Sequence, residues 1–149
     1  MIKILLALHL LTAVFAVGPL VGAATTASRG LRNKDAAATS GAARVLTIYS
    51  YASVIVVILG FGLMSANDPY GPGKVADFGD LWIWLSVLLW VVAMVLLLAV
   101  AVPALTKATV SLGEGDAVQA LTGRVAAAGG VVGLIFAAIV FLMVYRPGS

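Results

Sequence analysis

Four long apolar runs without a single charged residue constrain the fold of this chain more than any other feature. They cover residues 4–24, 45–64, 81–104 and 125–145, and none contains Asp, Glu, Lys or Arg. A helix needs roughly 20 apolar residues to cross a hydrocarbon core about 30 Å thick. Backbone polar groups must pair internally in lipid, so such runs cross as helices. The sequence therefore predicts an all-α protein, a bundle of four transmembrane helices.

Composition indicates that lipid surrounds most of the chain. Apolar residues make up 62% of the sequence and charged residues only 10%, a balance that a soluble domain of this length cannot hide in its core. The four spans and their connections use nearly the whole length. Residues 1–149 are therefore predicted to form a single integral membrane domain in contact with the lipid bilayer.

Several classes of site are excluded by the residue types present. The chain has no cysteine, which excludes disulfides, iron–sulfur clusters and thiolate zinc sites. No basic patch with interleaved aromatic residues is present, so nucleic acid is not an expected partner. No set of residues resembles a catalytic constellation, and we do not expect an enzyme.

Basic residues are distributed unevenly between the connections of the predicted helices. Spans alternate in direction, so residues 25–44 and 105–124 share one side, while residues 65–80 share the other side with both termini. The first side carries Arg29, Arg32, Lys34, Arg44, Lys107 and Arg124, and the second carries Lys3, Lys74 and Arg146. By the positive-inside rule, the first side is cytoplasmic and both termini lie outside. The predicted location is the cell (inner or plasma) membrane, with multiple passes.

A secretory signal peptide is a competing interpretation of the first run. Lys3 would be its basic end, and Val21-Gly22-Ala23 its small-residue cleavage site. The run is, however, longer than the usual 7–15 apolar residues of a signal peptide. Cleavage would also export residues 25–44, the most basic connection. Both facts favour an uncleaved helix.

The remaining connections contain helix-ending and helix-starting signals. Residues 67–73 hold two prolines and two glycines, which end the second helix. Asp116 precedes Gln119 at the spacing of a capping box. The fourth helix is thus predicted to begin before it enters lipid.

His9, the only histidine, lies inside the first predicted span, where an ionisable group is a functional hypothesis by default. At 1.5 Å per residue it would lie roughly 10 Å below the outer surface. One interpretation is structural: a neutral imidazole bonded to a Ser, a Tyr or a backbone carbonyl of a neighbouring helix. The others are an axial ligand to haem b, a copper ligand assisted by methionine, and a proton relay. Met64, Met94 and Met143 are not expected at the level of His9, which favours the structural interpretation.

Small residues give the clearest packing signal. Gly18 and Gly22 form one GxxxG pair, and Gly129 and Gly133 form another. A stripe along one face of the fourth helix consists of Ala126, Gly130, Gly133 and Ala137. Small residues let helix backbones approach closely in lipid. We expect these positions to pack against protein, either within the chain, in a homo-oligomer or in a larger membrane complex.

Two further features concern helix interiors. Pro19 cannot donate a hydrogen bond to the Phe15 carbonyl, so a kink is expected at Gly18-Pro19. Such kinks can line a transport path, and a small transporter is a third functional hypothesis.

Ser50, Ser53 and Gly60 fall roughly on one face of the second helix and are expected to bond or pack across an interface.

Several segments resemble a known family. They are residues 8–18, which contain His9 and Gly18, residues 59–63, and residues 81–86 running on to Val102-Pro103-Ala104-Leu105. The chain resembles the predicted integral membrane family DUF2269 over most of its length. A distant likeness to copper-resistance membrane proteins of the CopD type implies a metal or haem role for His9, although the chain offers no second histidine.

Three hypotheses follow from the sequence. The favoured one is a non-enzymatic accessory or scaffold subunit that associates with other membrane proteins and carries no cofactor, because the spans lack charge and present small-residue stripes. The second is a haem- or copper-binding redox protein using His9. The third is a small transporter.

Overall fold

The computed structural model describes residues 1–115 and 118–148, and these residues form four long helices that are apolar enough to cross a membrane. The first comprises α1 (Ile2–Thr12), the π-helical turn η1 (Ala13–Val17) and α2 (Gly18–Arg32); the second is α3 (Ala36–Met64); the third comprises α4 (Leu81–Val95), the π-helical turn η2 (Leu96–Ala101) and α5 (Val102–Gly113); the fourth is α6 (Gln119–Tyr145). The predicted all-α bundle of four spans is confirmed. Asp116, the expected cap of α6, lies outside the described residues.

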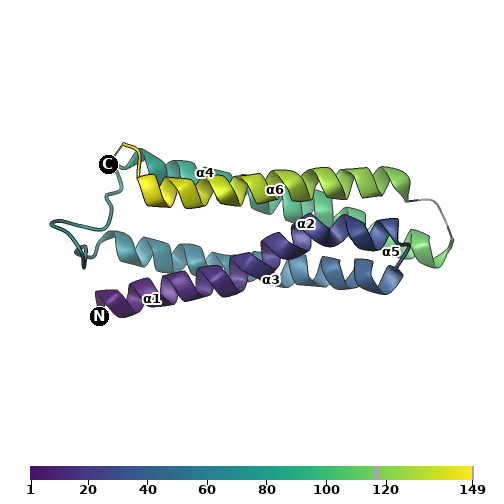
Figure 1. Cartoon of the computed structure of the whole chain (residues 1–149), viewed down its shortest axis with the longest axis horizontal. Helices are drawn as coiled ribbons and strands as arrows, with labels where there is room; N and C mark the ends of the chain where they lie inside the picture. Colours follow the sequence, from purple (N-terminus) through teal and green to yellow (C-terminus); the bar gives the residue numbers. More distant parts are fainter. Residues whose placement is uncertain (116–117, 149) are drawn as a thin grey trace.

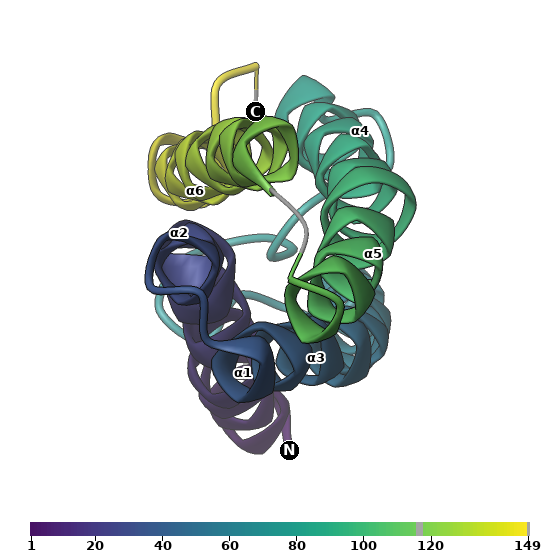
Figure 2. The same ribbon diagram turned by 90° about the vertical axis from the view of Figure 1, so that its right-hand side faces the viewer.

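The helices run up and down in an antiparallel bundle (Figure 1). Both termini and the connection 65–80 lie at one end, which we call the terminal end. The turn 33–35, the end of α5 and the start of α6 lie at the other, which we call the basic end. α2 packs against α3 and α6, α5 packs against α3, and α4 packs against α6. The helices therefore surround a shared core, as the view along the bundle shows (Figure 2).

Most of the predicted connection 25–44 is helical. α2 continues to Arg32 and α3 begins at Ala36, which leaves only residues 33–35 as a turn. Asp35 caps α3, because its Oδ1 accepts a hydrogen bond of 3.0 Å from the Ala38 N–H. Apolarity marks the part of a helix that lies in lipid, while Ala and Arg continue the helix beyond it. The apolar runs therefore understate the helix lengths.

A π-helical turn precedes each intramembrane proline. η1 ends just before Gly18-Pro19, and η2 ends two residues before Pro103. Each proline lacks the N–H that would bond the carbonyl four residues earlier, and a π-bulge accommodates such a mismatch. The first helix continues through Pro19 but changes direction there, so that α1 packs mainly against α3, whereas α2 also reaches α6 (Figure 1).

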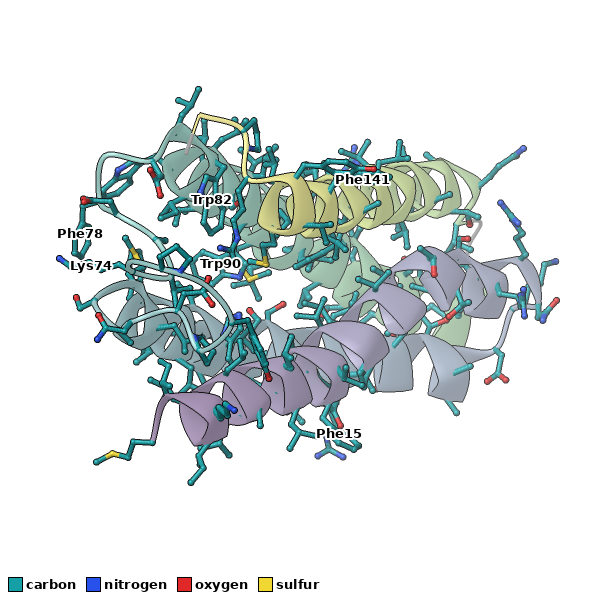
Figure 3. All side chains as sticks on the ribbon, turned by 60° about the vertical axis from the view of Figure 1, so that its left-hand side comes forward. Phe15, Lys74, Phe78, Trp82, Trp90 and Phe141 are labelled. Carbon is teal, nitrogen blue, oxygen red and sulfur yellow. The ribbon has the colours of Figure 1, made fainter. Side chains whose placement is uncertain are left out.

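The buried core is concentrated where α2, α3, α5 and α6 meet. Its largest fully buried apolar side chains are Leu20, Leu31, Leu46, Leu97, Leu105, Val125 and Val132. A smaller cluster at the terminal end contains Met64, Ala76, Trp82 and Ile83. Outside the core the surface is also apolar: Phe15 is 70% exposed and Phe141 is 64% exposed, and both point away from the bundle (Figure 3). Helices that are apolar on every side suit a lipid environment.

Candidate functional site

His9 joins the first span to the second through a hydrogen bond. Its Nδ1 lies 3.0 Å from the carbonyl oxygen of Val56 on α3. A carbonyl only accepts, so Nδ1 donates, and a neutral ring then leaves Nε2 as an acceptor. Among the described residues, none bonds Nε2. His9 therefore anchors α1 with one nitrogen and keeps the other available.

Gly60 makes this hydrogen bond sterically feasible. It lies one turn after Val56, and a Cβ added to Gly60 would lie 3.1 Å from Cε1 of the His9 ring. The missing side chain uncovers the Val56 carbonyl and gives the imidazole room to lie against α3. Gly60, which the sequence placed on a packing face, is thus the position that seats His9.

Among the described residues, His9 belongs to no cluster of the side chains that commonly bind metal ions. Within the described residues, no group of three His, Cys, Asp or Glu side chains lies close enough together to hold a metal ion. Met94, the methionine deepest in a predicted span, instead lies 3.6 Å from Ser53 Oγ. Copper(I) needs more than one soft or imidazole donor, and His9 offers a single nitrogen. Axial ligation of haem requires only that nitrogen.

A polar contact deep in the bundle joins α3 to α4. Trp90 Nε1 donates to Ser53 Oγ at 3.1 Å, and Ser53 Oγ donates to the Ser50 carbonyl at 2.6 Å. Trp82 and Trp90 both point into the space between the helices (Figure 3). The Ser50 hydroxyl is buried, and it has no partner among the described residues. The sequence predicted that Ser50 and Ser53 bond or pack across an interface. Ser53 does bond across one, between α3 and α4 of the same chain.

The tightest helix contact is between α2 and α6. A Cβ at Gly129 would overlap the carbonyl oxygen of Ala24, and a Cβ at Gly133 would lie 3.3 Å from Thr25 Cγ2. The second GxxxG pair therefore forms this seam. The first pair does not: Gly18 and Gly22 are exposed, and a Cβ at either would meet nothing within 4 Å.

Apart from Gly133, the predicted stripe on the fourth helix does not form its contact with α2. Gly130 and Ala137 are exposed, a Cβ at Gly130 would meet nothing within 4 Å, and Ala126 and Gly133 are half-buried. The reason is rotational, since one residue shifts the face of a helix by about 100°. Gly129, adjacent to the stripe, faces α2 instead.

Arg146 fastens the connection 65–80 to the end of α6. Its Nη1 donates to the Val75 carbonyl at 3.2 Å and lies 3.8 Å from Asp68 Oδ2. The guanidinium also lies 5.9 Å from the centre of the Trp82 ring. Residues so distant in the sequence gave no spacing signal for this contact, which closes the terminal end of the bundle.

The two ends of the bundle differ in charge. The six basic residues that the sequence grouped on one side all lie toward the basic end, Lys34 in the turn 33–35 and the other five on the helices that meet there. Lys3, Lys74 and Arg146 lie at the terminal end together with Asp68, Asp77 and Asp80, while Asp35 and Glu114 lie at the basic end.

Comparison with known proteins agrees with the fold. Neither the curated proteins nor the solved structures compared with the chain gave a match. The model of a family described as predicted integral membrane protein (DUF2269) matches residues 3–147. With four apolar spans and a match over nearly its whole length, this chain belongs to the DUF2269 family of integral membrane proteins.

Proposed function

We propose that this protein is a non-enzymatic accessory or scaffold subunit that associates with another membrane protein in the cell membrane. The observation that carries the proposal is the set of exposed glycines at Gly18, Gly22 and Gly130, which the fold of the chain does not use. Glycine weakens a helix relative to alanine. Close contact with a further helix is the role that such glycines suit in lipid.

These glycines belong to one continuous surface. On α2, Gly18, Gly22 and Thr25 recur at helical spacing; on α6, the stripe does the same. The two rows meet where Gly133 contacts Thr25, and α2 and α6 are neighbours in the bundle (Figure 2). We call Gly18, Gly22, Thr25, Ala126, Gly130, Gly133 and Ala137 the small-residue face. Its breadth across two helices supports docking of a partner helix.

Affinity purification from native membranes with mass spectrometry tests this proposal. The variant Gly130→Leu places a bulky side chain on the small-residue face. The variant Ala127→Leu places the same side chain at an exposed position of α6, about 90° around the helix from the centre of the stripe. Recovery of the partner should fall several-fold for Gly130→Leu alone. Both variants should keep wild-type thermal stability as isolated chains, because neither position is buried. Equal partner recovery from both variants would refute the proposal.

Haem binding by His9 is the second candidate. Its support is the hydrogen bond of Nδ1 to Val56, which fixes the ring and leaves Nε2 as the acceptor that an axial ligand needs. His9 would hold the iron on one side, and the haem would supply one-electron chemistry. A Soret band in the purified protein, lost in His9→Ala, would place this candidate above the scaffold. A colourless protein that co-purifies with a partner would favour the scaffold role over haem binding.

A further inference from the structure

We propose that the groove between the third and fourth spans at the basic end binds an anionic glycerophospholipid of the adjoining leaflet. The groove has a volume of about 270 Å³ and is formed by η2, α5 and the first turns of α6. Its lining combines two cations with an apolar wall, which matches a phosphate headgroup joined to an acyl chain.

The two cations come from different helices. Lys107 lies on α5, three residues beyond the third apolar run, and Arg124 lies on α6, one residue before the fourth. Both therefore stand at the level where the hydrocarbon core meets the headgroups. Basic pockets between transmembrane helices at this level suit anionic lipid headgroups.

Neither cation is neutralised by the part of the chain that the structure describes. Lys107 and Arg124 are exposed and have no ion pair or hydrogen bond among residues 1–115 and 118–148. No acidic side chain among residues 1–115 and 118–148 lines the groove. Two cations that share a small groove, with no counter-charge from the described residues, favour an anion between them.

The rest of the groove suits an acyl chain. Ala99, Pro103 and Lys107 recur at steps of four residues, so they lie on one face of the helix and run about 12 Å from the boundary into the membrane. Ala99 and Pro103, which lie deeper in the membrane than Lys107, have small side chains, and Leu121 lies on the outer side of Arg124 on α6. The π-helical turn η2 and Pro103 shape this stretch. A headgroup at Lys107 would thus direct its acyl chain along an apolar channel.

Lipid binding to the purified full chain, measured by native mass spectrometry, tests the proposal. The probes are phosphatidylglycerol and phosphatidylcholine with identical acyl chains, with glycerol 3-phosphate as a competitor that lacks acyl chains. The test variant is Lys107→Gln with Arg124→Gln. The matched control is Arg32→Gln with Arg44→Gln, which removes the same charge from exposed positions at the same end.

Wild type should bind phosphatidylglycerol more tightly than phosphatidylcholine, and the test variant should lose about thirtyfold of that affinity, as two lipid-facing cations would supply. The control should retain it. Ala99→Leu should weaken both lipids equally, because it fills the acyl channel without touching the cations. All of these residues are exposed, so an unchanged melting curve without added lipid verifies the fold.

Three results would overturn the proposal. One is equal affinity of wild type for the two lipids. Another is an equal loss in the test and control variants, which would indicate a general charge effect. The third is full displacement of phosphatidylglycerol by glycerol 3-phosphate at matched concentration, which would show that the site takes the phosphate alone.

Discussion

Nδ1 of His9 lies 3.0 Å from the Val56 carbonyl oxygen, and this hydrogen bond is the polar link between the first and second spans. α1 packs mainly against α3. Lipid supplies no hydrophobic force to hold α1 there, so close packing and interhelical hydrogen bonds must do so. His9 and Gly60 together thus position the part of the chain that precedes the kink.

The first prediction uses two glycines on α3. Gly60→Ala should lower the free energy of unfolding by about 1 kcal/mol, because its Cβ displaces the imidazole from Val56. Gly62→Ala is the control, since its Cβ would lie 3.8 Å from Leu5 Cδ2, an ordinary contact. Thermal unfolding in detergent measures both. An equal or higher midpoint for Gly60→Ala than for Gly62→Ala would contradict the anchoring role.

The second prediction compares the two buried serines. Ser53→Ala removes the acceptor of Trp90 Nε1 and should cost about 0.6–1.7 kcal/mol, the range for hydrogen bonds between transmembrane helices. Ser50→Ala removes a hydroxyl that has no partner among the described residues and should be neutral. Tryptophan fluorescence during thermal unfolding measures the stability of both variants. Identical midpoints for the two variants would count against the Ser53–Trp90 bond.

The spans were predictable from the sequence because lipid imposes a simple requirement of length and apolarity. The full length of each helix was not predictable, because the requirement for apolar residues applies only inside the membrane, whereas the helices continue beyond it. Asp35 before an alanine-rich segment was an available signal, since aspartate is a strong N-cap. Trp90 lies inside the third apolar run, but its partner Ser53 depends on how α3 and α4 face each other.

The choice between adjacent glycines on α6 shows where sequence reasoning ends. Gly129 belongs to a GxxxG pair and Gly130 to a stripe, and the two patterns share Gly133. Spacing alone gives each pattern a continuous face. Only the crossing position of α2 decides between them, and the carbonyl of Ala24 meets Gly129. The sequence likewise identified His9 as a candidate functional residue. It could not identify Val56 as its partner, because that pairing depends on how the helices are arranged.

The third prediction concerns topology. Both termini should lie outside, because the basic end carries six basic residues and the terminal end carries three. The chain has no native cysteine, so Asn33→Cys at the basic end and Gly71→Cys at the terminal end are unique, exposed labels. In intact cells an impermeant maleimide should label Gly71→Cys and not Asn33→Cys. Labelling of Asn33→Cys alone would reverse the orientation.

The last prediction separates packing within the chain from packing against a partner. Gly129→Ala should destabilise the isolated protein by about 1–3 kcal/mol, because its Cβ overlaps the Ala24 carbonyl and forces α2 and α6 apart. Gly130→Ala adds the same methyl group one residue later, where a Cβ meets nothing within 4 Å. It should be neutral or slightly stabilising, since alanine favours the helix. Thermal midpoints in detergent give the comparison. A fall for Gly130→Ala that matches Gly129→Ala would mean that the stripe, rather than Gly129, packs against α2.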